Sequence, residues 1–101
     1  MKIIIAGTGE VGFHLSKLLA QEEHDIVIID NNEKALERAS KNLDVSTIKG
    51  DATSLRVLEN ARANRCDLLI AVTSSQQVNI LACAMAKSFG VKKCIARISN
   101  T

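Results

Sequence analysis

The 101-residue sequence contains no proline, tryptophan or tyrosine, and only two phenylalanines. Proteins that hold single-stranded nucleic acid stack its bases on aromatic side chains, so this composition argues against such a surface. The formal net charge of +2 is too small to indicate a surface for duplex nucleic acid. We therefore expect no nucleic-acid partner.

The sequence also shows no sign of a disulfide scaffold or of a membrane-spanning segment. The three cysteines, Cys66, Cys83 and Cys94, are odd in number, and no pair has C-x-x-C spacing. This favours a reducing compartment and small buried thiols, with no metal site. No apolar run approaches the ~18 residues of a membrane helix, and no signal peptide is visible. We expect a cytoplasmic chain that does not insert into the membrane.

Short apolar runs alternate with segments of helical period along the whole chain. Strands are expected at 2–6, 25–30, 45–49, 68–72 and 94–98, and helices at 10–21, 32–41, 54–63 and 76–89. This alternation predicts the α/β class: a Rossmann-like doubly wound parallel sheet, strand order 3-2-1-4-5, with helices on both faces. We expect residues 1–101 to form one domain, as a fragment of a longer chain.

The helical periodicity also predicts which side chains face the core. Asn31 or Asn32 is expected to cap the second helix, and Gly90 to follow the fourth as its C′ residue. The residues expected to face the core are Val11, Leu15, Leu18 and Leu19 in the first helix, Leu36 and Ala39 in the second, Leu55, Leu58 and Ala61 in the third, and Val78, Leu81, Ala82, Met85 and Phe89 in the fourth.

A G-x-G-x-x-G motif follows the first strand and opens the first helix, as in dinucleotide-binding folds. Its first glycine permits a tight turn, its second lets a pyrophosphate approach the backbone, and its third lets the helix pack closely. Free N–H groups of the loop would point at the anion. The alternative is a glycine turn that binds nothing. The six residues are Gly7, Thr8, Gly9, Glu10, Val11 and Gly12.

Asp30 ends the second strand, 21 residues after Gly9, where an acid accepts hydrogen bonds from ribose hydroxyls. A carboxylate repels a 2′-phosphate, and Asn31 and Asn32 follow with no arginine to receive one; Asn31 is also expected to belong to the cofactor site. NAD or NADH is therefore favoured, ATP or ADP is the alternative, and NADP(H) is disfavoured. Asp30 could instead cap the second helix, or do both. We expect Asp30→Ala to weaken ligand binding and leave the ligand-free melting temperature nearly unchanged.

Asp51 and Ala52 follow the third strand, beside the expected adenine position. The Asp51 carboxylate could accept from an adenine amino group, and Ala52 could offer its N–H. The alternative is that Asp51 or Thr53 only caps the next helix.

Three further residues lie near the carboxyl ends of the fourth and fifth strands, where ligands of open α/β sheets bind. Thr73 and Ser74 could contact a second phosphate or ribose, or could simply cap the fourth helix together with Ser75. Arg97 could reach a phosphate, form an interdomain salt bridge, or lie at an ordinary surface position. Neither His14 nor His24 has a neighbour that suggests proton transfer, so we predict no catalytic residue.

With these residues assembled, the chain resembles the NAD-binding lobe of the Trk/Ktr potassium-transport regulators, the KTN or RCK N-terminal domains. The resemblance covers essentially all 101 residues. Its most discriminating parts are Gly-Asp-Ala-Thr after the third strand and Ala-Val-Thr after the fourth. One departure is that Ser75-Gln76-Gln77 stand where relatives often carry acidic residues, which leaves this side of the pocket less negative.

The resemblance implies a regulator and not an enzyme. Members bind NAD(H) or ATP/ADP, form homodimers or higher rings, and gate a membrane potassium transporter or channel subunit from the cytoplasmic face. Carried over to this sequence, residues 7–12 hold the pyrophosphate, Asp30 the ribose, and Asp51 and Ala52 the adenine, while Thr73, Ser74 and Arg97 complete the pocket. The alternative function is the cofactor-binding half of an NAD-dependent oxidoreductase, which would need a substrate domain.

Overall fold

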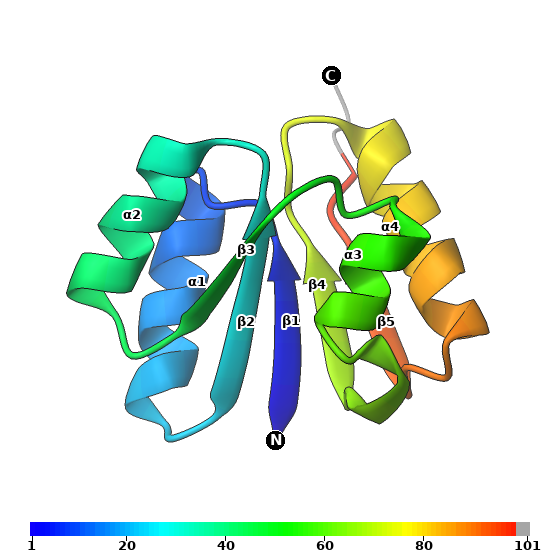
Figure 1. Ribbon diagram of the computed structural model, residues 1–101, viewed down its shortest axis with the longest axis horizontal. Coiled ribbons are helices and arrows are strands. Elements are labelled where there is room, and N and C mark those ends of the chain that lie inside the picture. Colours follow the sequence, from blue (N-terminus) through cyan, green and yellow to red (C-terminus); the bar gives the residue numbers. More distant parts are fainter. Residues whose placement is uncertain (99–101) are drawn as a thin grey trace.

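A computed structural model describes residues 1–98 and confirms the alternation of strands and helices (Figure 1). Residues 99–101 of the expected domain lie outside the described part. No helix within residues 1–98 is long and apolar enough to cross a bilayer. The strands are β1 (Lys2–Ala6), β2 (Asp25–Asp30), β3 (Ser46–Lys49), β4 (Leu68–Ala71) and β5 (Lys93–Ala96). The helices are α1 (Glu10–Gln21), α2 (Glu33–Asn42), α3 (Leu55–Asn60), the 3-10 turn η1 (Ala63–Arg65) and α4 (Gln76–Ser88).

All five strands run parallel in the order β3-β2-β1-β4-β5, which confirms the predicted topology. In the central strand, Ala6 is paired with Ile29 of β2 on one side and Ala71 of β4 on the other. Asp30 is paired with Lys49, and Ala71 with Ala96. The five carboxyl ends therefore meet at one edge of the sheet.

The sheet is covered on both faces, as its continuous apolar runs predict. Ile3 and Ile5 of β1 belong to a core with Phe13 of α1 and Leu36 of α2. Ile4 belongs to a second core, formed with residues of α3 and α4. Figure 1 shows the result as three layers, with α1 and α2 on one side of the sheet and α3 and α4 on the other.

The predicted inward face of the first helix is partly wrong. Val11 is 49% exposed and Leu18 is 61% exposed, while the buried residues of α1 are Gly12, Phe13 and Ser16. Because Gly12 has no side chain, α1 lies directly against the glycine loop at this position. Phe13, the next residue of the helix, is buried against the sheet. Close backbone approach outweighs the leucine pattern here.

The third and fourth helices differ from prediction in length and facing. α3 ends at Asn60, because Arg62 adopts the left-handed conformation with φ 59° before η1 begins. Leu55 is exposed instead of inward, and so is Leu81 in α4. Asn79, together with Ala82 and Ala86, forms the fully buried stripe of α4.

Three helices begin at side-chain caps. Asn32 accepts a hydrogen bond from the Ala35 N–H at 3.0 Å and caps α2, which settles the alternative with Asn31. Ser54 and Ser75 cap α3 and α4 in the same way. Gly90, with φ +97°, follows α4 as predicted.

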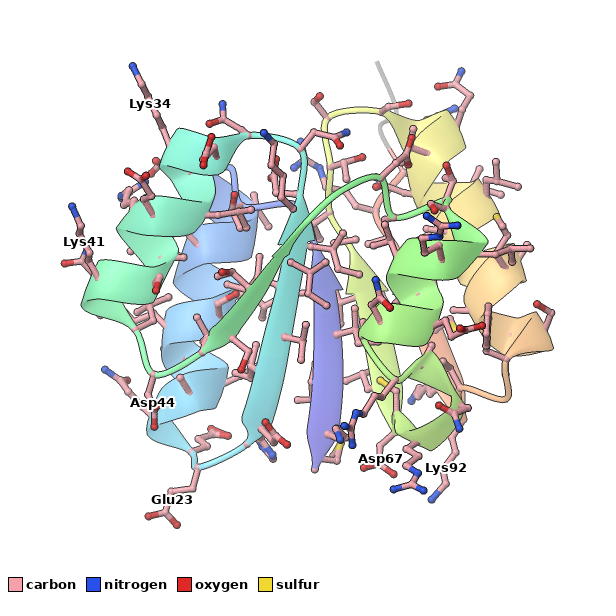
Figure 2. The ribbon with its side chains drawn as sticks, viewed as in Figure 1. Glu23, Lys34, Lys41, Asp44, Asp67 and Lys92 are labelled. Atoms are coloured by element: carbon pink, nitrogen blue, oxygen red, sulfur yellow. The ribbon has the colours of Figure 1, made fainter. Side chains whose placement is uncertain are left out.

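The amino end of the sheet carries a charged pair. Asp67 accepts from the Lys2 N–H at 2.9 Å, and its other carboxylate oxygen lies 3.2 Å from the Lys92 ammonium. Figure 2 shows Asp67 and Lys92 together at this end. The pKa of Asp67 is lowered, mainly by the hydrogen bond from the Lys2 N–H and to a smaller extent by the Lys92 ammonium.

Candidate functional site

A cleft of about 480 Å³ lies at the carboxyl ends of the strands. Its centre is the loop between β1 and α1, and its two sides are the segments that follow β2–β3 and β4–β5. The lining residues are Gly7, Thr8, Gly9, Ile29, Asp30, Asn31, Asn32, Ala35, Gly50, Asp51, Ala52, Val72, Thr73, Ser74, Ser75, Val78 and Arg97. The structure thus brings together ten of the thirteen residues predicted for the site; Glu10, Val11 and Gly12 do not line it.

Two glycines of the loop are required by the protein's own packing. Gly7 has φ +108°, and a Cβ there would lie 2.9 Å from the Thr73 nitrogen. A Cβ on Gly12 would lie 2.0 Å from the Gly7 carbonyl oxygen, well inside van der Waals contact. These two positions fix the tight turn and the close approach of α1 to the loop.

Gly9 is different, because neither packing nor strain demands a glycine there. Its φ of −66° suits any residue, and a Cβ would meet no atom within 4 Å. Gly9 lines the cleft and is the N-cap of α1, with no side-chain cap hydrogen bond. A helix N-terminus with open space above its N–H groups fits a phosphate, and a Cβ at Gly9 would enter that space.

Asp30 is tied to the glycine loop. Its Oδ2 accepts from both the N–H and the hydroxyl of Thr8, each at 2.8 Å, and its Oδ1 accepts from the Asn32 N–H at 2.8 Å. The Thr8 N–H is therefore not free to meet an anion, contrary to expectation. Because of these hydrogen bonds, we now expect removal of the Asp30 carboxylate to destabilise the fold. The expectation that Asp30→Ala leaves the ligand-free melting temperature nearly unchanged is withdrawn.

Asp51 forms a local turn and does not cap α3. Its Oδ1 accepts from the N–H and the hydroxyl of Thr53, at 2.9 and 2.7 Å, while Ser54 is the cap. The Thr53 hydroxyl, and then its N–H, lowers the pKa of Asp51. Asp51 is thus an anionic side chain on the same side of the cleft as Asp30, next to the buried Ala52.

Asn79 holds the opposite side of the cleft together by hydrogen bonds. It was not among the site residues predicted from the sequence. Asn79 is 1% exposed, and its Oδ1 accepts from the Thr73 N–H at 2.9 Å and hydroxyl at 2.6 Å. Its Nδ2 donates to the carbonyls of Thr73 at 3.1 Å and Arg97 at 3.0 Å. An asparagine on the apolar side of a helix was the one sequence feature that could have revealed it.

Ser74, Ser75 and Arg97 also line this side. The Ser75 hydroxyl accepts from the Val78 N–H and caps α4, so the cap alternative holds for Ser75 and not for Thr73 or Ser74. The Arg97 backbone N–H donates to the Ala71 carbonyl at 2.9 Å. Its guanidinium makes no ion pair with any residue in 1–98, which leaves a cation at the cleft.

Glu10 points away from the cleft. Its carboxylate lies 3.5 Å from the Arg38 guanidinium, and that guanidinium stacks 3.9 Å from the centre of the Phe13 ring. The Glu10 side chain therefore joins α1 to α2 on the molecular surface. Val11 is likewise exposed beside it, so only the backbone of these two residues remains a candidate for anion contact.

The described lining contains no histidine, cysteine, lysine or tyrosine. Burial raises the pKa of Cys83 to about 11 and also raises the pKa of Cys66 and Cys94, so the thiols are poor nucleophiles. No group of three or more metal-ligating side chains occurs in the described residues. The charged side chains of the described lining are the two carboxylates of Asp30 and Asp51 and the guanidinium of Arg97.

Solved structures with the same fold come from several kinds of protein. The AMP-bound Kef CTD of Shewanella denitrificans superposes with a TM-score of 0.78 at 23% identity, covering 94% of this chain and 57% of that one. The Bordetella bronchiseptica enzyme WbmG in complex with NAD gives 0.75 at 22% identity, covering 93% and 36%. Likeness at this level of identity establishes the fold alone.

Sequence relatives are more specific. The chain is 44% identical over 100 residues to the Trk system potassium uptake protein TrkA homolog of Archaeoglobus fulgidus, and 35% identical to that of Methanothermobacter thermautotrophicus. These alignments cover 99% of this chain but only 22% and 46% of the two relatives. The family model described as TrkA-N domain matches residues 3–101, and the chain therefore belongs to the TrkA-N domain family.

Proposed function

We propose that this chain is a regulatory domain that binds an adenine nucleotide, with NAD or NADH as the first candidate. In this proposal, nucleotide occupancy is communicated to a membrane potassium transporter or channel subunit from the cytoplasmic face. The support for the biological setting is the family, together with the names of its relatives as Trk potassium uptake proteins. These relatives are more than twice as long as this chain, so their activity as whole proteins is carried over here only as a proposal.

The observation that carries nucleotide binding is the open space at Gly9, flanked by Asp30 and Arg97. The pyrophosphate would lie over Gly9 at the start of α1, where no Cβ intrudes. The ribose would meet Asp30, whose Oδ1 accepts one protein hydrogen bond and keeps capacity for another. The Arg97 guanidinium would meet the part of the ligand beyond the first phosphate.

The charges of the cleft favour free ribose hydroxyls over a 2′-phosphate. Asp30 and Asp51 are both on the adenosine side, and Arg97, the one cation in the described lining, is on the other. A 2′-phosphate beside Asp30 would face a carboxylate with no compensating cation. NADP(H) should therefore bind more weakly than NAD(H).

In the proposed regulatory role, the bound nucleotide shifts an equilibrium between two states of an assembly. It can do so only if its affinities for the two states differ. A homodimer or higher ring would supply such states. The lining offers no histidine, cysteine, lysine or tyrosine for proton transfer to a substrate. The oxidoreductase alternative has the shared fold as its only support, and fold does not determine function.

Thermal unfolding of the chain with NADH, NADPH, ATP and ADP tests the proposal. A ligand at 100 times its Kd adds about 2.7 kcal/mol, which corresponds to a rise of roughly 10–20 °C for a domain of this size. We expect NADH to give a larger shift than NADPH at equal concentration. No shift with any of the four nucleotides would refute nucleotide binding, and a preference for NADPH would refute the role of Asp30.

A further inference from the structure

Asn79 joins the two segments that form the far side of the cleft. These segments are the loop after β4, which contains Thr73, and the end of β5, where Arg97 lies. The side chain donates to the Arg97 carbonyl at 3.0 Å, 18 residues away in sequence, and to the Thr73 carbonyl, 6 residues away. It uses both oxygen lone pairs and both N–H groups, so its hydrogen-bonding capacity is fully occupied.

Asn79 does not contact a ligand itself, because it is 1% exposed and absent from the cleft lining. It acts on residues that do line the cleft. The Thr73 hydroxyl has two acceptors within the protein, Asn79 Oδ1 at 2.6 Å and the Ser75 carbonyl at 3.1 Å, and its oxygen accepts from the Ser75 N–H at 3.2 Å. Thr73 is thereby turned into the protein, and Ser74 and Arg97 remain as the groups this side presents to a ligand.

The side-chain hydrogen bonds that hold the two sides of the cleft share no residue. The adenosine side is fixed by hydrogen bonds of Asp30 to Thr8 and of Asp51 to Thr53. None of these bonds involves Asn79. A change at Asn79 should therefore disturb the far side alone, since its partners Thr73 and Arg97 both belong to that side.

We propose that Asn79 is a positioning residue that sets how strongly the cleft prefers a ligand with two phosphates over a mononucleotide. This inference rests on the proposed nucleotide-binding function. A mononucleotide such as AMP is held by Asp30, Asp51 and the N–H groups above Gly9. The second phosphate and second ribose of NADH would extend past the glycine loop toward Ser74 and Arg97. Asn79 fixes the backbone at these positions, through Thr73, which precedes Ser74, and through the Arg97 carbonyl.

The test compares the affinities of AMP and NADH for wild-type chain and the Asn79→Ala variant. We expect the NADH Kd to rise by about tenfold or more, the loss typical of a hydrogen bond to a charged group. The AMP Kd should stay within about twofold, below the effect of one such bond. Equal weakening of both ligands would show a merely structural role, and no change for either would also overturn the inference.

Two further variants sharpen the comparison. Arg97→Gln should reproduce the selective loss of NADH affinity, and the double variant should lose less than the product of the two single effects, because Asn79 acts partly through Arg97. Asn42→Ala is the matched control: this asparagine is exposed at the end of α2, where it donates only to the Arg38 carbonyl. It should leave both affinities unchanged.

A measurement on wild-type protein keeps the inference testable if Asn79→Ala does not fold. The side-chain amide resonances of Asn79 should shift in NMR spectra when NADH is added and stay in place when AMP is added. An Asn79 signal that responds equally to both, or to neither, would overturn the inference. If wild-type chain binds neither AMP nor NADH, the proposed function itself fails, which is a different result from loss of selectivity.

Discussion

Thr8 and Asp30, 22 residues apart in sequence, are joined by two hydrogen bonds at 2.8 Å, both accepted by Asp30 Oδ2. One comes from the Thr8 backbone and one from its hydroxyl, and Thr8 is only 4% exposed. The carboxylate proposed to hold a ribose thus also anchors the glycine loop to β2. Binding and stability are coupled at this residue, which changes what its removal should do.

Asp30→Ala should lower both nucleotide affinity and the free energy of unfolding. The stability loss should be roughly 1–3 kcal/mol, because the buried Thr8 donors lose a charged acceptor. Asp30→Asn is the matched comparison: its one amide oxygen can still accept from Thr8, but its NH2 group cannot accept from the Asn32 N–H, so it should recover part of the stability. Urea unfolding without ligand measures both variants; an Asp30→Ala stability equal to wild type would contradict the anchoring role.

Gly12→Ala should destabilise the fold strongly. The added methyl group would lie 2.0 Å from the Gly7 carbonyl oxygen, so α1 must move away from the loop. Overpacking of this kind costs about 1–3 kcal/mol or more. Urea unfolding measures the change, and a variant as stable as wild type would show that α1 is held less closely than the structure indicates.

Glu10→Gln tests the reassignment of Glu10 from the cleft to the helix surface. The carboxylate lies 3.5 Å from the exposed Arg38 guanidinium, so the ion pair is screened by solvent and contributes at most about 1 kcal/mol. We expect nucleotide affinity within about twofold of wild type, below the effect of one typical hydrogen bond. A large change in affinity in a binding titration would return Glu10 to the site.

The Asp67 contacts predict a pH dependence of stability. Its pKa in the folded chain is lowered from the ordinary value of 3.8, mainly by the hydrogen bond from Lys2. A lowered pKa means that the ionised carboxylate stabilises the fold at pH values above the pKa of Asp67 in the unfolded chain. This contribution is lost as the pH falls through the lower pKa in the folded chain. The stability difference between wild type and Asp67→Asn should therefore stay constant above about pH 5 and shrink as the pH falls below it. A difference that stays constant below about pH 5 in urea unfolding would contradict the assignment.

The fold could be predicted from sequence because its main determinants are local and repeated. Alternating apolar runs and helical segments leave a parallel sheet as the outcome, and right-handed crossovers restrict its strand order. The inward face of α1 could not be predicted in the same way. The contact between Gly12 and Gly7 depends on backbone approach, which hydrophobic periodicity does not report.

The position of a residue at the cleft was predictable where the motif marks it, as for Gly9 and Asp30, which both line the cleft. It was not predictable where a residue acts through hydrogen bonds across the sheet. The predicted strand order places the loop after β4 and the end of β5 at one edge of the sheet, but no pattern in sequence shows that Asn79 joins them by hydrogen bonds. The same reason explains why Thr8 was expected to face the ligand and instead donates to Asp30.

A nucleotide titration of wild-type chain beside Gly9→Ala tests the central claim most directly. Gly9 has an ordinary φ of −66° and open space at the Cβ position, so the variant should fold, with a loss of no more than about 1 kcal/mol from replacing glycine by alanine at a helix N-cap. Its methyl group would enter the space assigned to the pyrophosphate. We predict NADH binding by wild type and a loss of at least about tenfold in affinity for Gly9→Ala. Equal NADH affinities for the two proteins, both folded under the conditions of the titration, would contradict the account.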